Sequence, residues 1–369
     1  MNYKPILFTA LLLAFLSWHC GSSRQAVASA DTGSTTKGLK DYYINYFDVG
    51  VAVSPRALKT DEAGLVLQQF NSVTPENAMK MGPIQPREGQ FFWRDADSIA
   101  AFAQRHGLKM RGHTLVWHSQ APVWFFTTSA GDTVSREVLL QRMKDHITAV
   151  VNRYKGKVYA WDVVNEVISD NPRELYRQSP FLRIIGEDFI EQAFRFAHEA
   201  DPSALLFYND YNEIDPVKRE KIFQMVRRLK EKGVPIHGVG LQGHWAINEP
   251  SSGQLDSTLS RFAQLDLPIH ITEIDISVYP KEHNAREAKS GDKDTTFSAA
   301  REAAQIEKYR MCFELFRKYD KHITSVTFWN ISDRHSWLDN FPVRNRKDYP
   351  LLFDRNLQPK KAYWEVVRF

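Results

Sequence analysis

The sequence predicts an α/β protein built as a single (β/α)8 TIM barrel. Eight short apolar runs alternate with longer amphipathic segments over residues 39–369. Strands that alternate with helices favour a parallel sheet covered by helices. A chain of 369 residues is long for one ordinary domain, but it suits a barrel of this kind. The region contains no repeat of the solenoid type, so we expect one domain.

The eight predicted strands are short runs rich in β-branched and other apolar residues. They cover residues 47–53, 70–76, 108–117, 158–166, 205–210, 238–244, 268–275 and 323–330. In the seventh run, Ile269, Ile271 and Ile274 suit the interior of a sheet. Such runs predict the buried strands of the barrel.

The segments between the strands carry apolar residues at helical spacing, as in residues 135–154 and 215–233. In the second segment, Asp215 can cap the helix and Pro216 occupies its first position. Gly233 is suited to end that helix. These patterns predict the helices that connect successive strands.

Residues 1–20 are predicted to form a signal peptide. Lys4 precedes an apolar run over residues 5–16, which is too short to span a membrane. Cys20 follows at the place where bacterial lipoproteins carry a lipidated cysteine, although residues 17–19 depart from the small residues expected there. Lipidation at Cys20 and cleavage near residues 28–30 both stay open. The sequence therefore predicts export, as a secreted or periplasmic protein or an outer-membrane lipoprotein.

Residues 21–38 are small and polar without periodicity, which predicts a flexible linker before a catalytic barrel over residues 39–369. The barrel is expected to be monomeric, because it buries its own core. With Cys20 in the leader, only Cys312 remains, so no disulfide is expected in the mature protein. Cys312 lies in a helical pattern and is expected to be buried and unreactive.

The composition argues against several other classes of protein. The net charge of +4 is too mild and too evenly spread to favour nucleic acid. A membrane contact is expected only through a lipid anchor at Cys20. No zinc motif, phosphate loop or dinucleotide fingerprint occurs, so no metal or cofactor is expected.

Polar residues gather at the ends of the predicted strands. Active sites of such barrels lie at the carboxyl ends of the strands. The seventh run ends in Glu273 and Asp275, two positions apart and therefore on one face. Other strand ends supply Glu76, Asn77, Lys80, His113, Trp117, Gln120, Asn165, Glu166, Asn209, Gln242, His244, Trp329 and Asn330. Each alone could cap a helix or pack in the core, but together they predict one polar rim.

Glu166 and Glu273 end the fourth and seventh strands, on different sides of the barrel. Glycoside hydrolysis needs one carboxylic acid to protonate the leaving oxygen and a second to attack or stabilise the anomeric carbon. The two glutamates could therefore face each other across a bound sugar.

Seven blocks resemble, in order, those of glycoside hydrolase family 10, the endo-β-1,4-xylanases. The resemblance runs from about residue 40 to the C-terminus, and the blocks are TPENAMK, GHTLVWHSQ, WDVVNEV, YNDYN, GLQGHW, ITEIDI and TFWNISDRHSWL. It implies a retaining double displacement with Glu166 as general acid/base and Glu273 as nucleophile. Asp275 would hold His244, which would in turn hold Glu273. Asn165 would bind the sugar 2-hydroxyl.

The same resemblance implies the binding residues for xylan and xylo-oligosaccharides. The glycone side would be lined by Glu76, Asn77, Lys80, His113, Trp117, Gln120 and Gln242. Trp329 and Trp337 would pack on the sugar at the cleavage point. Gln120 and Trp337 would crowd the space of a hydroxymethyl group, which glucose has and xylose lacks, and so exclude cellulose.

Several positions keep two interpretations. Tyr211 and Asn212 are assigned to the aglycone half, and His118 stays open between a substrate contact and a supporting role. Arg334 and His335 either touch xylan side groups or face solvent. Two other functions are open to a chain of this kind. A β-glucanase or mixed xylanase/cellulase is disfavoured by the GHTLVWHSQ block, and a non-catalytic xylan-binding barrel is disfavoured by the intact glutamate pair.

Overall fold

The computed structural model describes residues 37–281 and 295–369. The predicted signal peptide, residue Cys20 and nearly all of the predicted linker lie outside the described residues. Residues 37–369 form one compact unit, to which the following description applies.

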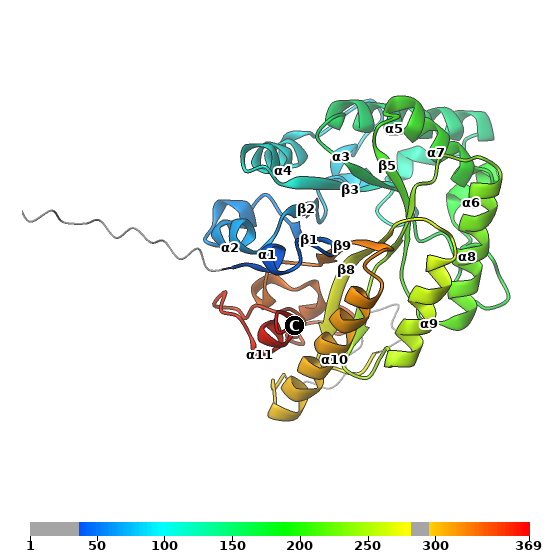
Figure 1. Cartoon of the computed structure of the whole chain (residues 1–369). Coiled ribbons are helices and arrows are strands. Elements are labelled where there is room, and N and C mark those ends of the chain that lie inside the picture. Colours follow the sequence, from blue (N-terminus) through cyan, green and yellow to red (C-terminus); the bar gives the residue numbers. More distant parts are fainter. Residues whose placement is uncertain (1–36, 282–294) are drawn as a thin grey trace, which may run out of the picture. The chain divides into compact units, whose positions relative to one another are not determined.

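The predicted (β/α)8 barrel is confirmed (Figure 1). The strands are β1 Asp48–Val53, β2 Ser72–Pro75, β3 Lys109–Trp117, β4 Ala160–Asn165, β5 Leu205–Asp210, β6 Gly238–Leu241, β7 His244–Ala246, β8 Ile269–Ser277 and β9 Ile323–Phe328. The strand order β6-β5-β4-β3-β2-β1-β9-β8 is closed by a pairing between β6 and β8, and every named pairing is parallel. All carboxyl ends therefore lie on one rim.

The short strand β7 differs from the prediction, which placed His244 at the end of the sixth strand. β6 ends at Leu241, and the chain turns at Gly243 with a φ of +77°, a conformation that glycine adopts without strain. The chain then pairs with the outer part of β8, where His244 is opposite Asp275. β8 itself continues to Ser277, so Glu273 and Asp275 lie within this strand rather than at its last residues.

Helices surround the strands in Figure 1. They are α1 Leu39–Tyr42, α2 Glu62–Gln69, α3 Met81–Ile84, α4 Arg94–Arg105, α5 Arg136–Tyr154, α6 Pro180–Ile185, α7 Phe189–Ala200, α8 Pro216–Glu231, α9 Ser252–Ala263, α10 Ala299–Lys318 and α11 Lys361–Val366. The part of the chain that the structure describes also has four 3-10 turns, η1 Ala57–Lys59, η2 Val123–Phe125, η3 Asp333–His335 and η4 Trp337–Asp339. None of these described helices has the length and apolar character needed to cross a membrane.

The helix ends follow the sequence signals. The side chain of Asp215 accepts a hydrogen bond from the backbone amide of Lys218 at 2.8 Å, and Pro216 is the first residue of α8. Gly233 follows this helix with a φ of +66°. Cys312 is fully buried within α10, as expected, and burial raises the pKa of its thiol.

A charged network occupies the interior of the barrel below the rim. Arg111 is 1% exposed and forms a bidentate ion pair with Asp162, and its guanidinium lies 4.8 Å from the centroid of the Phe207 ring. Burial of a charge is tolerated where it is paired in this way. Asp162 also lies 3.0 Å from Nδ1 of His113, whose ring approaches Glu273 to 4.0 Å. The barrel core thus supports the rim from below.

Candidate active site

The turn after β4 holds Glu166 in an unusual backbone conformation. Its φ is +58°, in the left-handed region that non-glycine residues rarely adopt. The Glu166 amide donates to the carbonyl of Asn209 at 2.9 Å, and its carbonyl accepts from Nε of Arg177 at 3.1 Å. The next two backbone amides both donate to the hydroxyl of Tyr208 at 3.2 Å. These four bonds fix the direction in which the carboxyl group points.

The Glu166 carboxyl group has one neutral donor on each oxygen. Nε1 of Trp117 donates to Oε2 at 2.9 Å, and Nε2 of Gln242 donates to Oε1 at 3.0 Å. Trp117, expected to line the glycone side, therefore contacts the predicted acid/base directly. The backbone carbonyl of Gln242 also accepts from the backbone amide of Glu273 at 2.8 Å, so this residue links the two glutamates.

Glu273 on β8 is 4% exposed and is kept ionised by its surroundings. Burial alone would raise the pKa of this carboxyl group. The nearby His113 and His244 and the amide of Asn209 outweigh burial and lower the pKa to about 2. Asn209 Nδ2 lies 2.8 Å from Oε1, and His244 Nε2 lies 3.2 Å from Oε2. A buried, oriented carboxylate of this kind can act as a nucleophile.

His244 joins Glu273 to Asp275, the contact pattern expected from the sequence. Its Nδ1 lies 3.0 Å from Oδ2 of Asp275, and Nε1 of Trp337 donates to the same oxygen at 2.8 Å. Burial lowers the pKa of His244, but the charges and hydrogen bonds of Asp275 and Glu273 raise it to about 10. The imidazole is therefore a cation that donates to both carboxylates.

Asn165 and Asn209 form a second hydrogen-bonded support for Glu273, and no sequence motif predicted this role for Asn209. Nδ2 of Asn209 donates to Asn165 as well as to Glu273, and Thr272 Oγ1 donates to the Asn209 oxygen at 2.6 Å. A Cβ at Gly240 would lie 2.3 Å from that oxygen, so only glycine leaves room. Among the described residues nothing accepts from the buried Nδ2 of Asn165, which leaves it free to meet a substrate hydroxyl.

The predicted glycone residues cluster around Lys80. Its Nζ donates to Asn77 at 2.9 Å and lies 5.2 and 5.9 Å from the ring centroids of Trp117 and Trp329. Burial lowers the pKa of Lys80, which Glu273 and Glu76 oppose. Burial likewise raises the pKa of Glu76, against the charge of Lys80. The structure thus brings these polar side chains to the same part of the rim as the two glutamates.

Of the residues predicted to pack on the sugar or to exclude glucose, Trp329 and Trp337 lie close to site histidines, whereas, among the described residues, Gln120 forms no side-chain hydrogen bond with them. The ring of Trp337 is 4.9 Å from that of His244, and the ring of Trp329 is 5.2 Å from that of His113. Gln120 is exposed, with a φ of +57°, and its side chain has no hydrogen-bond partner in the described part of the chain. The expected joint action of Gln120 and Trp337 stays a prediction.

A cluster around Asp170, which includes the predicted aglycone residues Tyr211 and Asn212, was not foreseen. Its carboxylate accepts from Tyr211 at 2.5 Å, from Lys218 at 2.7 Å and from Arg177 at 3.0 Å. Asn212 Nδ2 also reaches it at 3.3 Å. No motif in the sequence marks Asp170, because its partners come from three separate segments.

His118 lies beside a small cavity that it shares with Glu166 and Arg177. Burial and the charge of Arg177 lower the pKa of His118 to about 4, so the ring is neutral. Its Nδ1 is buried without a partner among the described residues. Neither of the two roles left open for this residue is decided by these contacts.

Glu166 directly after β4 and Glu273 on β8, both at the carboxyl rim of a parallel barrel, define the class of barrel glycoside hydrolases. Within this class the chain belongs to glycosyl hydrolase family 10, whose model matches residues 38–369. That family is retaining and uses a catalytic pair of glutamates.

Curated relatives agree with this assignment. Endo-1,4-beta-xylanase B of Paenibacillus barcinonensis is 49% identical over 89% of this chain and 97% of its own. The beta-1,4-xylanase of Dictyoglomus thermophilum is 46% identical over 97% of each chain. Among solved structures, xylanase XynB of P. barcinonensis, complexed with a conduramine derivative, has a TM-score of 0.87 at 48% identity and covers 90% of this chain and 99% of its own. A mutant structure in complex with xylotriose has a TM-score of 0.85 at 40% identity, covering 90% and 100%.

Proposed function

We propose that this protein is an endo-1,4-β-xylanase that cleaves internal bonds of xylan with retention of configuration. The observation that carries the proposal is the environment of Glu273, a buried carboxylate whose pKa is lowered to about 2. It is linked through Gln242 to a second glutamate, Glu166, whose carboxyl group accepts only from neutral donors among the described residues. Glu273 is thus held as an anion, and Glu166 lies beside it as the second carboxyl group that a double displacement needs.

In the first step, Glu166 donates its proton to the leaving glycosidic oxygen while a Glu273 oxygen attacks the anomeric carbon. The carbon–oxygen bond to the aglycone breaks, and a glycosyl ester with Glu273 forms. Asn209 and His244 hold the two oxygens of this nucleophile. The free Nδ2 of Asn165 is placed to bind the sugar 2-hydroxyl, a contact that strengthens in the transition state.

In the second step, Glu166 acts as base. Esterification removes the negative charge of Glu273, so the neighbouring Glu166 is more easily ionised. It takes a proton from water, whose oxygen attacks the anomeric carbon and displaces Glu273. Two displacements on the same carbon leave the product with the original configuration.

Preference for xylose over glucose is assigned to bulk near the cleavage point. The indole of Trp337 is fixed by its hydrogen bond to Asp275 and lies beside His244. A hydroxymethyl group on the sugar ring would have to displace this indole. A built-in clash excludes a larger substrate more firmly than a lost contact does.

The test is release of reducing ends from linear β-1,4-xylan and from a soluble cellulose, with Glu166→Ala as the blank. Release from xylan alone supports the proposal. Comparable release from both polysaccharides would replace it with a broader glucanase. Binding of xylan without release would identify a non-catalytic xylan-binding barrel.

We also propose that residues 1–20 direct export and that the barrel acts as a monomer, anchored to a membrane only if Cys20 is lipidated. The support is the apolar leader and the polar linker of residues 21–38. Fractionation of cells that express the full chain or Cys20→Ala tests the anchor. Wild-type protein in the membrane fraction and a soluble variant support lipidation, whereas soluble protein in both cases contradicts it. Light scattering gives the oligomeric state.

A further inference from the structure

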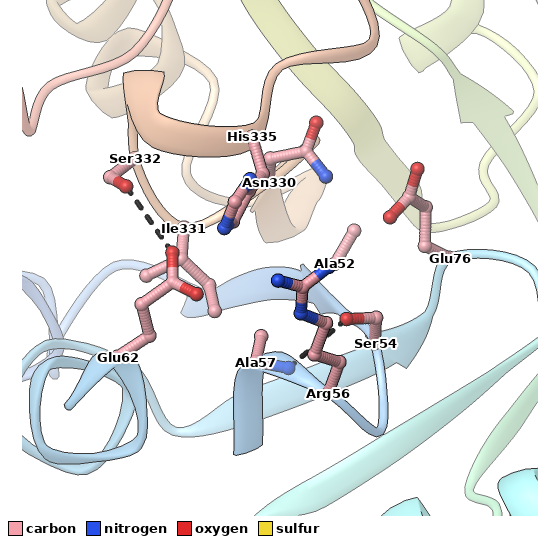
Figure 2. A pocket seen from close by; sticks show the side chains of 10 residues that line it. All are labelled: Ala52, Ser54, Arg56, Ala57, Glu62, Glu76, Asn330, Ile331, Ser332 and His335. Atoms are coloured by element: carbon pink, nitrogen blue, oxygen red, sulfur yellow. Dashed lines mark hydrogen bonds between the residues drawn. The ribbon is translucent and has the colours of Figure 1, made fainter. Parts of the chain in front are cut away.

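A second cavity opens beside the glycone residues (Figure 2). It has a volume of about 210 Å³ and lies between the ends of β1 and β9, with η1 and η3 at its border. Pockets for drug-sized ligands span roughly 300–1,000 Å³, so this cavity suits a single sugar-sized group. Its polar lining includes Ser54, Arg56, Glu76, Asn330 and His335.

The cavity and the predicted glycone side share Glu76. This residue lines the cavity, and its charge also interacts with those of Lys80 and Glu273. Figure 2 shows Glu76 on one side of the cavity, with Arg56 and His335 across from it. A group entering the cavity would therefore branch from a sugar on the glycone side.

Asn330, which lines the cavity together with Glu76, has an unusual backbone conformation and an unpaired side-chain oxygen. Its φ is +118°, which is unfavourable for any residue with a side chain, and it is buried in the lining of the cavity. Its Oδ1 has no partner among the described residues. Such strain and unsatisfied polarity concentrate at functional sites.

Among the charged side chains that line the cavity, one cation has no counter-ion in the described part of the chain. Of the two acids, Glu76 interacts with the charge of Lys80 and Glu62 with that of Arg334. Arg334 itself is paired with Asp61 at 2.7 Å and does not line the cavity. Arg56 is exposed, and no described residue forms an ion pair or hydrogen bond with its guanidinium. The cavity therefore offers a free guanidinium.

We propose that this cavity binds an acidic side group of the polysaccharide, a uronic acid linked to a xylose on the glycone side. The inference rests on the proposed xylanase function. A guanidinium binds a carboxylate through two parallel hydrogen bonds, which assigns the carboxylate to Arg56. Ser54, His335 and Asn330 are placed around the rest of the ring. A neutral pentose branch would fill the space but leave Arg56 unpaired.

The experiment compares xylo-oligosaccharides that carry one uronic acid branch with the same compounds after reduction of the carboxyl to a hydroxymethyl group. The readout is the ratio of their kcat/KM values, which isolates the carboxylate. We expect the wild type to favour the acidic compound and Arg56→Gln to lower the ratio by about 2- to 5-fold, as for an exposed ion pair. The preference should also weaken as salt is added.

Lys59→Gln is the matched control, because Lys59 is an exposed cation on η1 that does not line the cavity. Its ratio should equal that of the wild type. If the ratio of kcat/KM values fell equally in Arg56→Gln and Lys59→Gln, the preference would come from the general positive charge of this surface. That result would overturn the specific site. His335→Ala provides a second variant, and melting temperatures show that each protein is folded.

Failure of this inference can be told apart from failure of the proposed function. If unbranched xylo-oligosaccharides are cleaved but the wild type shows no preference for the acid, or prefers a neutral pentose branch, the uronic acid site is wrong. If no oligosaccharide is cleaved, the proposed function fails. In that case, calorimetry measures the affinities of Glu166→Ala for the same two branched compounds, without hydrolysis. Tighter binding of the acidic compound supports the site, and equal affinities contradict it.

Discussion

Nε of Arg177 donates to the backbone carbonyl of Glu166 at 3.1 Å, and this bond supports a turn whose φ is +58°. Arg177 is itself held by Asp170. We therefore expect Arg177→Met to loosen the predicted acid/base without removing it. Xylan, a substrate with a poor leaving group, should lose about 10- to 100-fold in kcat/KM, the range of a misplaced general acid. Aryl xylosides with good leaving groups should lose much less, because they need little protonation.

Arg183→Met is the control for that experiment. Arg183 is an exposed arginine of α6 whose guanidinium bonds only to the carbonyl of Gln178 among the described residues. Its kinetics should match the wild type. Equal losses on both substrate types in Arg177→Met would mean a general structural defect and would rule out the positioning role.

Glu273→Ala should abolish hydrolysis, with a fall in kcat of about 10⁴-fold or more, because no nucleophile remains. Added azide should restore turnover by attacking from the vacated side of the sugar. One displacement replaces two, so the glycosyl azide has inverted configuration, which NMR of the product detects. Wild-type-like activity of the variant would remove Glu273 from the mechanism.

His244→Gln should shift the acid limb of the pH profile. In the wild type, the cationic ring of His244 helps to hold the pKa of Glu273 near 2. Loss of a neighbouring opposite charge raises a carboxyl pKa by roughly 1–3 units. The acid limb of kcat/KM, which reports ionisation of the free enzyme, should move upward by that amount. An unchanged limb would mean that His244 does not control the charge of Glu273.

The same substitution predicts a pH-dependent change in stability. The pKa of His244 is raised to about 10 in the folded protein, against about 6.5 when unfolded. Its contribution to the free energy of unfolding is therefore complete below about pH 6.5 and is lost as the pH rises to about 10. Denaturant unfolding of wild type and His244→Gln should give a stability difference that shrinks across this window. A difference that stays constant would contradict the raised pKa.

The strands and the polar rim could be predicted because they depend on local composition and on one geometric rule. Buried strands such as β8 are rich in Ile, and the carboxyl ends of parallel barrel strands meet on one rim. Glu166 and Glu273 could thus be placed together although 107 positions separate them. The family blocks then supplied individual roles.

Other features depend on packing that the chain order does not reveal. The strand β7 is three residues long and forms only because β8 extends beyond the barrel. Asn209 bridges Asn165 and Glu273 because Gly240 leaves space on the neighbouring strand. The cavity at Arg56 lies where β1 and β9, the first and last strands of the barrel, meet. These two strands are far apart in the sequence.

Retention predicts a specific separation of the two glutamates. In retaining glycosidases the carboxyl groups lie about 5–5.5 Å apart, whereas inverting enzymes need roughly 6.5–9.5 Å to admit a water molecule. Gln242 bonds to both Glu166 and the backbone of Glu273, which favours the short spacing. A crystal structure with a bound xylo-oligosaccharide measures this distance, and NMR of the first products shows their anomeric form. We expect the short distance and a β-anomer at first. An initial α-anomer, together with a separation in the longer range, would replace the double displacement with direct attack by water.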